Sequence, residues 1–455
     1  MCFYNWNKTE SSTPEKVFKP KTEGEFASIF QLAHKNNKQV RVVGAARHTW
    51  GGISMSDGYV IDMRYFNKVL SVDSKNKTAT AQAGIVIHTL FRKLAKHDLS
   101  VNNMGGIDAQ SLAGVISTGT HGSSLYHGTF SDDVLSMRVM LYNGKIITVN
   151  KDDSDFSAFI VSLGSLGAVL DVTLQCADLF YVHSETEEVQ TKISNITKEY
   201  ITPFLKKHHF FQVAIDPYSR KIVFYKRDKV EARDIPILQR KLTLPVKSFL
   251  QNIRELIGIY IVEFIVLKII TMFPGTTEKT LALSSKFAKE KFTDISYKAL
   301  TIGGNDKHGF YINKTFHDEE YAVGLDDVSN ALNKILEIFK EFPDIPLLLA
   351  LRFVKASNAW LSPSFERDTC YIDVLIFAKN FAKWSLFVER VEKSLYQTGA
   401  RPHWGKHNFL NYKVITENNL YPKLEEFRKA KQKYDPHNVF GNTYINERLS
   451  PAQSP

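Results

Sequence analysis

The turn at residues 41–49 constrains the fold of this chain more than any other segment. A valine-rich stretch, residues 41–43, runs into the small residues 44–46, and His48 follows the turn. A turn without bulky side chains lets backbone N–H groups surround an anion such as a diphosphate. A histidine at its edge lies close enough to contact, or to be bonded to, the group that the diphosphate carries. The segment therefore predicts a strand that ends at an anion site.

Two further segments of small residues support this prediction. Residues 103–124 combine glycines with serines and threonines, and residues 163–169 read LGSLGAV. Together they supply N–H and O–H donors with little bulk, as a long polyphosphate-containing ligand lying across the domain requires. No strand is followed by G-x-G-x-x-G, so a Rossmann dinucleotide site is not indicated. His403 and His407 stand four residues apart without the glutamate of a zinc peptidase, and we expect no metal site there.

The first 175 residues alternate strand and helix patterns with short connections. A helix start at Thr22 is followed by apolar residues at helical spacing, and a second amphipathic helix is predicted at residues 86–97. This alternation predicts a compact α+β domain. From residue 180 onward, long strand-like runs alternate with lysine-rich helical stretches. We therefore expect two domains, at residues 1–180 and 181–455.

Composition and charge exclude several classes of protein. The excess of 58 Lys and Arg over 48 Asp and Glu gives a net charge of +10. It is spread along the chain and fits a solvated basic surface, and we see no nucleic-acid-binding signature. Three widely spaced cysteines form no disulfide framework, and the chain shows no signal-peptide pattern, so a cytoplasmic location is expected.

One apolar segment qualifies the expected location. Residues 256–273 are strongly apolar but carry Glu263 and Lys268, and two charges near the middle argue against a transmembrane helix. A core helix and a helix lying in the membrane surface over residues 254–273 both stay open. Peripheral membrane contact is therefore a second expectation for this chain.

Taken together, the motifs resemble a known family. They are RVVGAARHTW, NMGGIDAQSLAGVISTGTHGSS and LGSLGAVLDVTLQ, followed by LRFVKASNAWLSPSFERDTCYIDV, RPHWGK and DPHNVFGN. In this order they are similar to the FAD-linked oxidases of the vanillyl-alcohol oxidase superfamily, in the aldonolactone and alditol oxidase branch. The resemblance covers nearly the whole chain. It implies an α+β protein with an N-terminal FAD-binding domain of the PCMH type and a C-terminal α+β cap of the D-arabinono-1,4-lactone oxidase type, which binds the substrate.

The resemblance also implies where FAD binds. His48 occupies the position that bonds the flavin 8α-methyl in covalent members, so FAD is expected to be attached there. Gly105 resembles the position beside the flavin C4a–N5 edge where oxidases tend to carry glycine, which favours O2 as the acceptor. The residues expected to bind the cofactor are Val43, Gly44, Ala45, Ala46, Arg47, His48, Thr49, Gly105, Gly106, Ser111, Gly114, Ser117, Thr118, Gly119, Thr120, Gly122, Ser123, Gly167 and Val169.

On the substrate side, strand alternation over residues 347–355 places Ala350, Arg352 and Val354 on one face. The resemblance implies that Arg352 binds the substrate oxygen and steadies negative charge on the reduced flavin. It also implies that Lys406 lies near the flavin N1–C2=O edge, where a cation favours electron acceptance. His403, in the same HWGK segment, completes the expected catalytic set.

One position departs from the family pattern. Relatives carry a glutamate where this chain has Ala350, and an alanine can neither contact nor deprotonate a substrate hydroxyl. Three residues lie in suitable motifs to replace it, namely His403, Glu366 and Glu320. A different substrate or weakened activity is the other explanation of the change.

The expected function is FAD-dependent oxidation of a CH–OH group in a sugar-1,4-lactone or polyol, with O2 reduced to hydrogen peroxide. Two alternatives stay open. One is a dehydrogenase of the same fold that passes electrons to another acceptor. The other is a flavin-binding protein in which Ala350 marks weakened catalysis.

Overall fold

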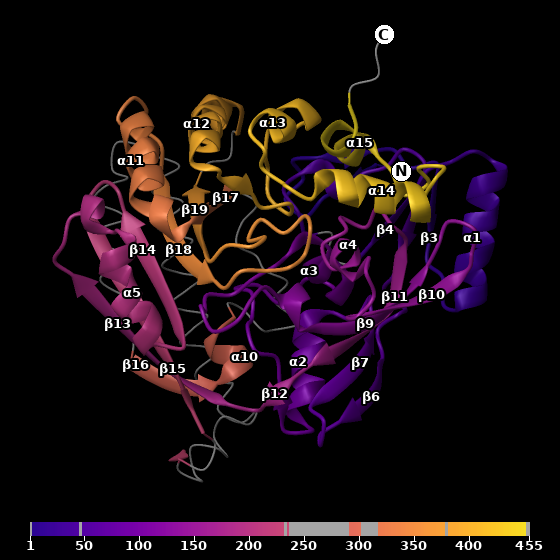
Figure 1. Cartoon of the computed structure of the whole chain (residues 1–455), viewed down its shortest axis with the longest axis horizontal. Helices are drawn as coiled ribbons and strands as arrows, with labels where there is room; N and C mark the ends of the chain where they lie inside the picture. Colours follow the sequence, from indigo (N-terminus) through magenta and orange to yellow (C-terminus); the bar gives the residue numbers. More distant parts are fainter. Residues whose placement is uncertain are drawn as a thin grey trace.

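The computed structural model describes residues 2–44, 48–231, 234–235, 291–301, 317–377 and 381–451. Small sheets and helices of the N-terminal part form one half of the molecule. An eight-stranded sheet and its helices form the other half (Figure 1). The expected α+β class is confirmed by this mixture of layers.

A parallel three-stranded sheet leads to the turn after residue 43. Its strand order is β3–β5–β4, and α1 connects β3 to β4. The side chain of Thr22 accepts a hydrogen bond from the Glu25 N–H (3.2 Å), so this helix begins where the sequence predicts. Its apolar stripe is buried as expected, because one face packs on the sheet. The elements are β3 (Lys16–Phe18), α1 (Glu23–Lys35), β4 (Val40–Val43) and β5 (Tyr59–Asp62).

An antiparallel five-stranded sheet completes the N-terminal layers. Its order is β10–β9–β11–β7–β6, so β11 pairs with both β9 and β7, which precede it in the chain. The elements are β6 (Val69–Asp73), β7 (Thr78–Gln82), α2 (Ile87–Ala95), α3 (Leu112–Thr118), β9 (Val134–Met140), β10 (Ile146–Asn150), α4 (Phe156–Phe159) and β11 (Ala168–Gln175). Two short pairs join β1 (Phe3–Tyr4) to β2 (Ser11–Ser12) and β8 (Leu99–Ser100) to β12 (Ala177–Asp178).

The large sheet has the order β16–β13–β15–β14–β18–β19–β17–β20. All its described pairings are antiparallel, so directly opposed residues share a face. Its strands are β13 (Tyr181–Val189), β14 (Phe210–Asp216), β15 (Lys221–Val230), β16 (Lys291–Ile295), β17 (His317–Gly324), β18 (Leu347–Val354), β19 (Thr369–Ile376) and β20 (Arg401–Pro402).

The two faces of this sheet differ in chemistry. One face packs under helices, and Leu349, Leu351 and Phe353 of β18 belong to the hydrophobic core there. The opposite face carries Ala350 and Arg352, so the predicted alternation along this strand is confirmed. That second face is turned toward the N-terminal half (Figure 1). The helices of this half are α5 (Lys198–Lys207), α10 (Ser296–Ala299), α11 (Val328–Phe339) and α12 (Phe381–Leu395).

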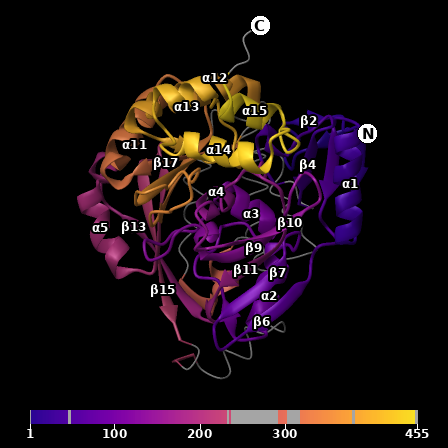
Figure 2. The same ribbon diagram turned by 45° about the vertical axis from the view of Figure 1, so that its right-hand side comes forward.

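The C-terminal segment returns to the first half. Three helices, α13 (Tyr412–Glu417), α14 (Leu424–Tyr434) and α15 (Thr443–Leu449), lie over the N-terminal layers (Figure 2). Phe427, Phe440 and Ile445 are buried in the same core as Phe26 and Phe30 of α1. The division into residues 1–180 and 181–455 stays a prediction, but the packing shows that the second segment supplies part of the first core.

In the described part of the chain, no helix combines the length and the apolar character that crossing a membrane requires. The segment at residues 254–273, for which a membrane-surface helix was one expectation, lies outside the described residues.

Candidate active site

The turn after β4 packs tightly against the start of α3. A Cβ on Gly44 would lie 2.1 Å from Oγ of Ser111, so only glycine fits there. Ser111 caps α3, because its side chain accepts a hydrogen bond from the Gly114 N–H (3.4 Å). Residues 45–47 lie outside the described residues. Two of the three predicted cofactor segments therefore meet at this point.

His48 follows the turn between two indole rings. Its ring centroid lies 4.9 Å from that of Trp6 and 5.0 Å from that of Trp50. Its Nε2 is buried and makes no hydrogen bond to the described residues. Burial, together with the nearby charge of Lys406, lowers the pKa of His48 to about 3, so the imidazole is neutral near pH 7. A neutral ring with a free nitrogen is suited to form a bond to a ligand.

The loop around residues 103–122 is held by close contacts at its glycines. A Cβ on Gly122 would lie 2.0 Å from Oδ1 of Asn103, and one on Gly105 would lie 2.8 Å from Cγ2 of Thr120. Gly119 ends α3 with φ of 70°, in the left-handed region that favours glycine. Close packing therefore favours glycine at position 105 whichever electron acceptor the enzyme uses.

Ser123 joins this loop to the large sheet. Its hydroxyl donates to the carbonyl of Phe211 in β14 and accepts from the Phe353 N–H of β18 (3.0 Å). Its own carbonyl accepts from the Phe211 N–H (3.2 Å). The predicted cofactor residue Ser123 therefore uses its hydroxyl to fix the sheet against the N-terminal half.

The HWGK segment reaches the same place from the C-terminal side. The carbonyl of Gly405 accepts hydrogen bonds from the Trp50 N–H (3.0 Å) and from the hydroxyl of Thr49 (3.2 Å). Nζ of Lys406 lies 4.5 Å from the centroid of the Trp50 ring and pairs with Asp318. Burial acts to lower the pKa of Lys406, but the carboxylates around it outweigh that effect and the pKa is raised. Lys406 is therefore a buried, fully charged cation beside His48.

Arg352 provides a second cation from the large sheet. It pairs with Asp373 of β19 at 2.6 Å, and its side chain keeps 22% of its surface exposed, whereas Asp373 is fully buried. A Cβ on Gly106 would lie 3.9 Å from Nη1 of Arg352, which places the guanidinium beside the small-residue loop. Burial raises the pKa of Asp373 well above its ordinary value, although Arg352 opposes the shift.

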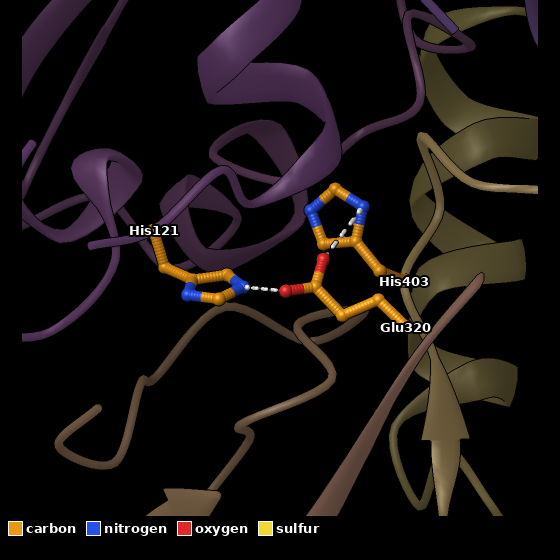
Figure 3. Close-up of side chains that lie close together, drawn as sticks. All are labelled: His121, Glu320 and His403. Carbon is orange, nitrogen blue, oxygen red and sulfur yellow. Dashed lines mark ion pairs between the residues drawn. The ribbon is translucent and has the colours of Figure 1, made fainter. Parts of the chain in front are cut away.

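His121, Glu320 and His403 form a buried group beside these cations (Figure 3). Nε2 of His121 lies 3.0 Å from Oε1 of Glu320, and Nδ1 of His403 lies 3.9 Å from Oε2. Burial acts to raise the pKa of Glu320, but His121 outweighs it, so the pKa lies well below its ordinary value. The Glu320 carboxyl group is therefore ionised near pH 7.

Hydrogen bonds fix which ring nitrogens carry protons. Nδ1 of His121 faces the carbonyl of Gly122 (2.9 Å) and must donate to it, whereas Nδ1 of His403 accepts from the Gly405 N–H (3.1 Å). Burial lowers the pKa of His403 to about 3, so its ring is neutral. The donor atoms of the three residues lie within 4.8 Å of one another, a spacing that would also admit a metal ion. The lone pair of His403 Nδ1 is already engaged, and the expectation of no metal stays a prediction.

The structure separates the predicted site residues into two groups. Gly44, His48, Thr49, Gly106, Thr118, Arg352, His403 and Lys406 converge between the two halves. Gly167 and Val169 lie apart from them, at the pairing of β11 with β9, where a Cβ on Gly167 would lie 2.5 Å from Cγ1 of Val139. Glu366 is exposed, so of the three predicted replacements for the missing carboxylate it is the one outside this group.

Sequence reasoning missed Asp373, Asp318 and His121. Asp373 is the single charged residue within the apolar strand β19, which is a signal that was available in the sequence. It lies directly opposite Ala350 of β18 and Glu320 of β17, but that pairing joins segments distant in the sequence.

The residues present fit FAD. Gly44, Gly105 and Gly106 carry no side chain and are partly exposed, so their backbone can approach a ligand closely. The buried Nε2 of His48 makes no hydrogen bond to the described residues. When bound, FAD supplies a two-electron acceptor, and the chain presents Lys406 and Arg352 as the two cations at that place.

Comparisons with known proteins agree with this site. The family model described as D-arabinono-1,4-lactone oxidase matches residues 172–448, and one described as FAD binding domain matches residues 14–150. L-gulonolactone oxidase of Bos taurus is 27% identical over 461 residues, covering 98% of this chain and 97% of that protein. L-gulono-1,4-lactone dehydrogenase of Mycobacterium tuberculosis is 26% identical over 452 residues, covering 98% and 99%. Cholesterol oxidase from B. sterolicum has the same fold, with a TM-score of 0.74, 16% identity and coverage of 99% and 96%.

The matched family model spans more than half of the chain, and the FAD-binding domain precedes it in the same order as the two halves of the structure. The chain belongs to the D-arabinono-1,4-lactone oxidase family and is an FAD-dependent oxidoreductase acting on CH–OH groups.

Proposed function

We propose that this protein oxidises a CH–OH group of a sugar-1,4-lactone to a carbonyl, with O2 as the acceptor and hydrogen peroxide as the second product. The observation that carries the proposal is the meeting of Arg352 and Lys406 with Gly106 and Trp50 between the two halves. The reaction balances as R2CHOH + O2 giving R2C=O + H2O2. The lactone substrates named for the relatives support the choice of substrate class.

Arg352 is the group best placed to hold the substrate hydroxyl. Its side chain is partly exposed while Asp373 fixes it from behind, so it can donate to an oxygen without changing position. A cation at that oxygen stabilises the negative charge that develops as the hydroxyl loses its proton. Lys406, held by Asp318, adds positive charge on the side of His48.

Glu320 is our candidate for the proton acceptor that Ala350 cannot be. It is ionised, it lies next to His403, and its Oε1 lies 3.0 Å from Nε2 of His121. The low pKa of Glu320 makes it a weak base, and His121 holds its carboxylate in place. We expect Glu320→Gln to lower kcat by roughly 10²-fold to 10⁴-fold while FAD content stays unchanged.

The test is to mix purified protein anaerobically with L-gulono-1,4-lactone and with D-arabinono-1,4-lactone, and then to admit O2. Bleaching of the yellow colour by either lactone, followed by rapid recovery in O2 with one peroxide per turnover, is the expected result. Bleaching with slow recovery in O2 and fast recovery with a dye favours the dehydrogenase. A yellow protein that no lactone or polyol bleaches favours a binding protein with weakened catalysis.

We also propose that FAD is attached through Nε2 of His48. The free, neutral ring nitrogen supports this. Yellow colour should stay with the wild-type protein after acid precipitation and leave a His48→Ala variant. Peripheral membrane contact through residues 254–273 is a further proposal, and sedimentation with acidic liposomes at two salt concentrations tests it.

A further inference from the structure

On the face of the large sheet that is turned toward the N-terminal half, some residues are buried and others are partly exposed. Glu320, Asp373 and Tyr371, on β17 and β19, are buried. Ala350 of β18 and Ala214 of β14 are directly opposed, and both are partly exposed. These two small residues therefore belong to the accessible part of this face.

Polar side chains border these two residues on one side. Arg352 of β18 is directly opposed to Gln212 of β14, and Oε1 of Gln212 accepts a hydrogen bond from Nη1 of Arg227 in β15 (2.7 Å). On β15 the residue directly opposite Gln212 is Tyr225, and Arg227 lies opposite Phe210, two residues further along. Two strand spacings of about 4.8 Å each, with an offset of two residues at about 3.4 Å each, put the two arginine backbones roughly 12 Å apart. The three strands lie side by side in the sheet (Figure 1).

The charges on this face do not balance. The buried carboxylates near Arg352 each have a cationic or histidine partner: Asp373 with Arg352, Asp318 with Lys406, and Glu320 with His121. Asp216, at the end of β14 away from Arg227, accepts hydrogen bonds from Ser219 and from the Tyr218 N–H. Arg227 has no such charged partner among the described residues. Among the described residues, its hydrogen-bond partners are the neutral side chains of Gln212 and Ser184, and Nη2 makes no hydrogen bond.

The electrostatics agree with an uncompensated cation. Burial and the charge of Arg352 lower the pKa of Arg227 to about 10, with Tyr225 opposing them. A carboxylate partner within hydrogen-bond reach would instead raise this pKa. Arg227 is still charged near pH 7, so it is an almost buried guanidinium with no carboxylate partner among the described residues.

We propose that Arg227 and Gln212 form a subsite for a carboxylate carried by the substrate, so that the enzyme accepts open-chain sugar acids in addition to lactones. This inference rests on the proposed oxidation at the Arg352 site and names a further class of substrate for it. A guanidinium binds a carboxylate with charge-assisted hydrogen bonds, whereas the ring oxygen of a lactone carries no charge.

The chemistry at this place favours a carboxylate over a phosphate ester. One guanidinium with one open nitrogen matches the single charge and two oxygens of a carboxylate. A doubly charged phosphate with three terminal oxygens requires further donors. Ala214 and Ala350 lie two residues along their strands from Gln212 and Arg352, on the side away from Arg227, so a carbon chain that joins the two arginines lies over Gln212.

The experiment compares L-gulonate with L-gulono-1,4-lactone on the FAD-loaded enzyme. The two compounds share a carbon skeleton and differ by ring closure and by the carboxylate charge. Binding is measured anaerobically by calorimetry and turnover by O2 uptake. Arg227→Met should weaken gulonate binding at least tenfold and change lactone binding less than twofold. Arg390→Met, which removes an exposed arginine paired with Glu341, is the matched control and should change neither.

A second variant guards against a folding defect. Gln212→Glu places a carboxylate beside Arg227, so it should satisfy the guanidinium, keep the protein folded and abolish gulonate binding while lactone binding remains. Equal loss of both ligands in Arg227→Met, or no loss of gulonate, overturns the proposal. So does competition by inorganic phosphate at concentrations similar to those of gulonate. If neither compound is oxidised, the proposed function fails, and the binding measurement still decides the role of Arg227.

Discussion

At the scale of single residues, Asp373 determines how Arg352 can act. Its carboxyl group lies 2.6 Å from the guanidinium and is fully buried, so it holds the guanidinium from a side that substrate does not reach. We expect Asp373→Asn to lower kcat/KM by about tenfold to hundredfold, because Arg352 loses its orientation. Stability should fall by up to roughly 3 kcal/mol, since one partner of a buried pair is lost while Arg352 is still partly hydrated.

Steady-state kinetics and urea unfolding measure the two effects of Asp373→Asn. Glu366→Gln, which changes an exposed carboxyl group nearby in the sequence, is the control and should match the wild type. Unchanged kcat/KM in Asp373→Asn would show that Arg352 keeps its position without a counterion.

Glu392 gives the fold a pH dependence. It is fully buried in α12, and burial raises its pKa from 4.5 to about 7, while Tyr396 and the Phe409 N–H (2.9 Å) act against the rise. The folded state therefore binds this proton more tightly than the unfolded state does. The stabilisation is complete below about pH 4.5 and is lost as the pH rises through about 7, which amounts to roughly 3 kcal/mol.

Replacing Glu392 by Gln removes that titration and keeps an oxygen to accept from Phe409 and Tyr396. The free energy of unfolding should then vary less between pH 5 and pH 8, and Glu392→Gln should be the more stable protein at pH 8. Urea unfolding at several pH values measures this. A variant with the same slope as the wild type would assign the pH dependence to other groups.

The sequence predicted individual side chains well where local periodicity decides. Alternation placed Arg352 and Ala350 on one face of β18, and the motif positions led to His403 and Lys406. Asp373 and His121 were missed because their importance comes from contacts with strands and loops far away in the sequence. Strand pairing across such distances leaves no mark in local composition.

At the scale of elements, the loop before Ser123 depends on Gly122. A Cβ there would lie 2.0 Å from Oδ1 of Asn103 and 2.5 Å from the carbonyl of Met104. We expect Gly122→Ala to destabilise the protein by about 1–3 kcal/mol, because the loop must move away from both atoms. FAD content should fall with it. Gly24→Ala in α1, where the nearest atom lies 4.0 Å away, is the control and should be neutral or slightly stabilising.

Thermal unfolding and the ratio of flavin to protein absorbance measure these effects. A Gly122→Ala protein with wild-type stability and flavin content would mean that Asn103 can move aside without cost.

Elements with strong local signals were predictable, and their arrangement was not. The cap at Thr22 and the apolar stripe of α1 were both readable in advance. The order β15–β14–β18–β19–β17 was not, because it brings together strands separated by more than a hundred residues. Residues 45–47 and 236–290 lie outside the described part of the chain, so the predictions made there remain predictions.

At the scale of the whole molecule, the last helix stabilises the first domain. Ile445 of α15 is fully buried in the core that also contains Phe26 and Phe30. Ile445→Ala should lower stability by about 3 kcal/mol, since a large buried side chain leaves a cavity. Hydrogen exchange should increase in α1 and β4 more than in β18 and β19. Lys413→Ala on the surface of α13 is the control.

An equal rise of exchange in both halves after Ile445→Ala would instead show that the molecule unfolds as one cooperative unit. The return of the C-terminal segment was not foreseen from the sequence. The change in texture near residue 180 marks the start of the large sheet, whereas nothing in the later motifs indicates that they pack on the first half.

The hydrogen bonds of Ser123 to β14 and β18 limit how far the two halves of the enzyme can move apart. Opening the two halves would break its hydrogen bonds to Phe211 and Phe353 and the bond from the Lys355 N–H to the carbonyl of His127 (3.1 Å). Hinged closure around a substrate, as in clamshell enzymes, is therefore disfavoured in this protein. Substrate binding is therefore expected to move side chains at the site more than it moves one half of the molecule against the other.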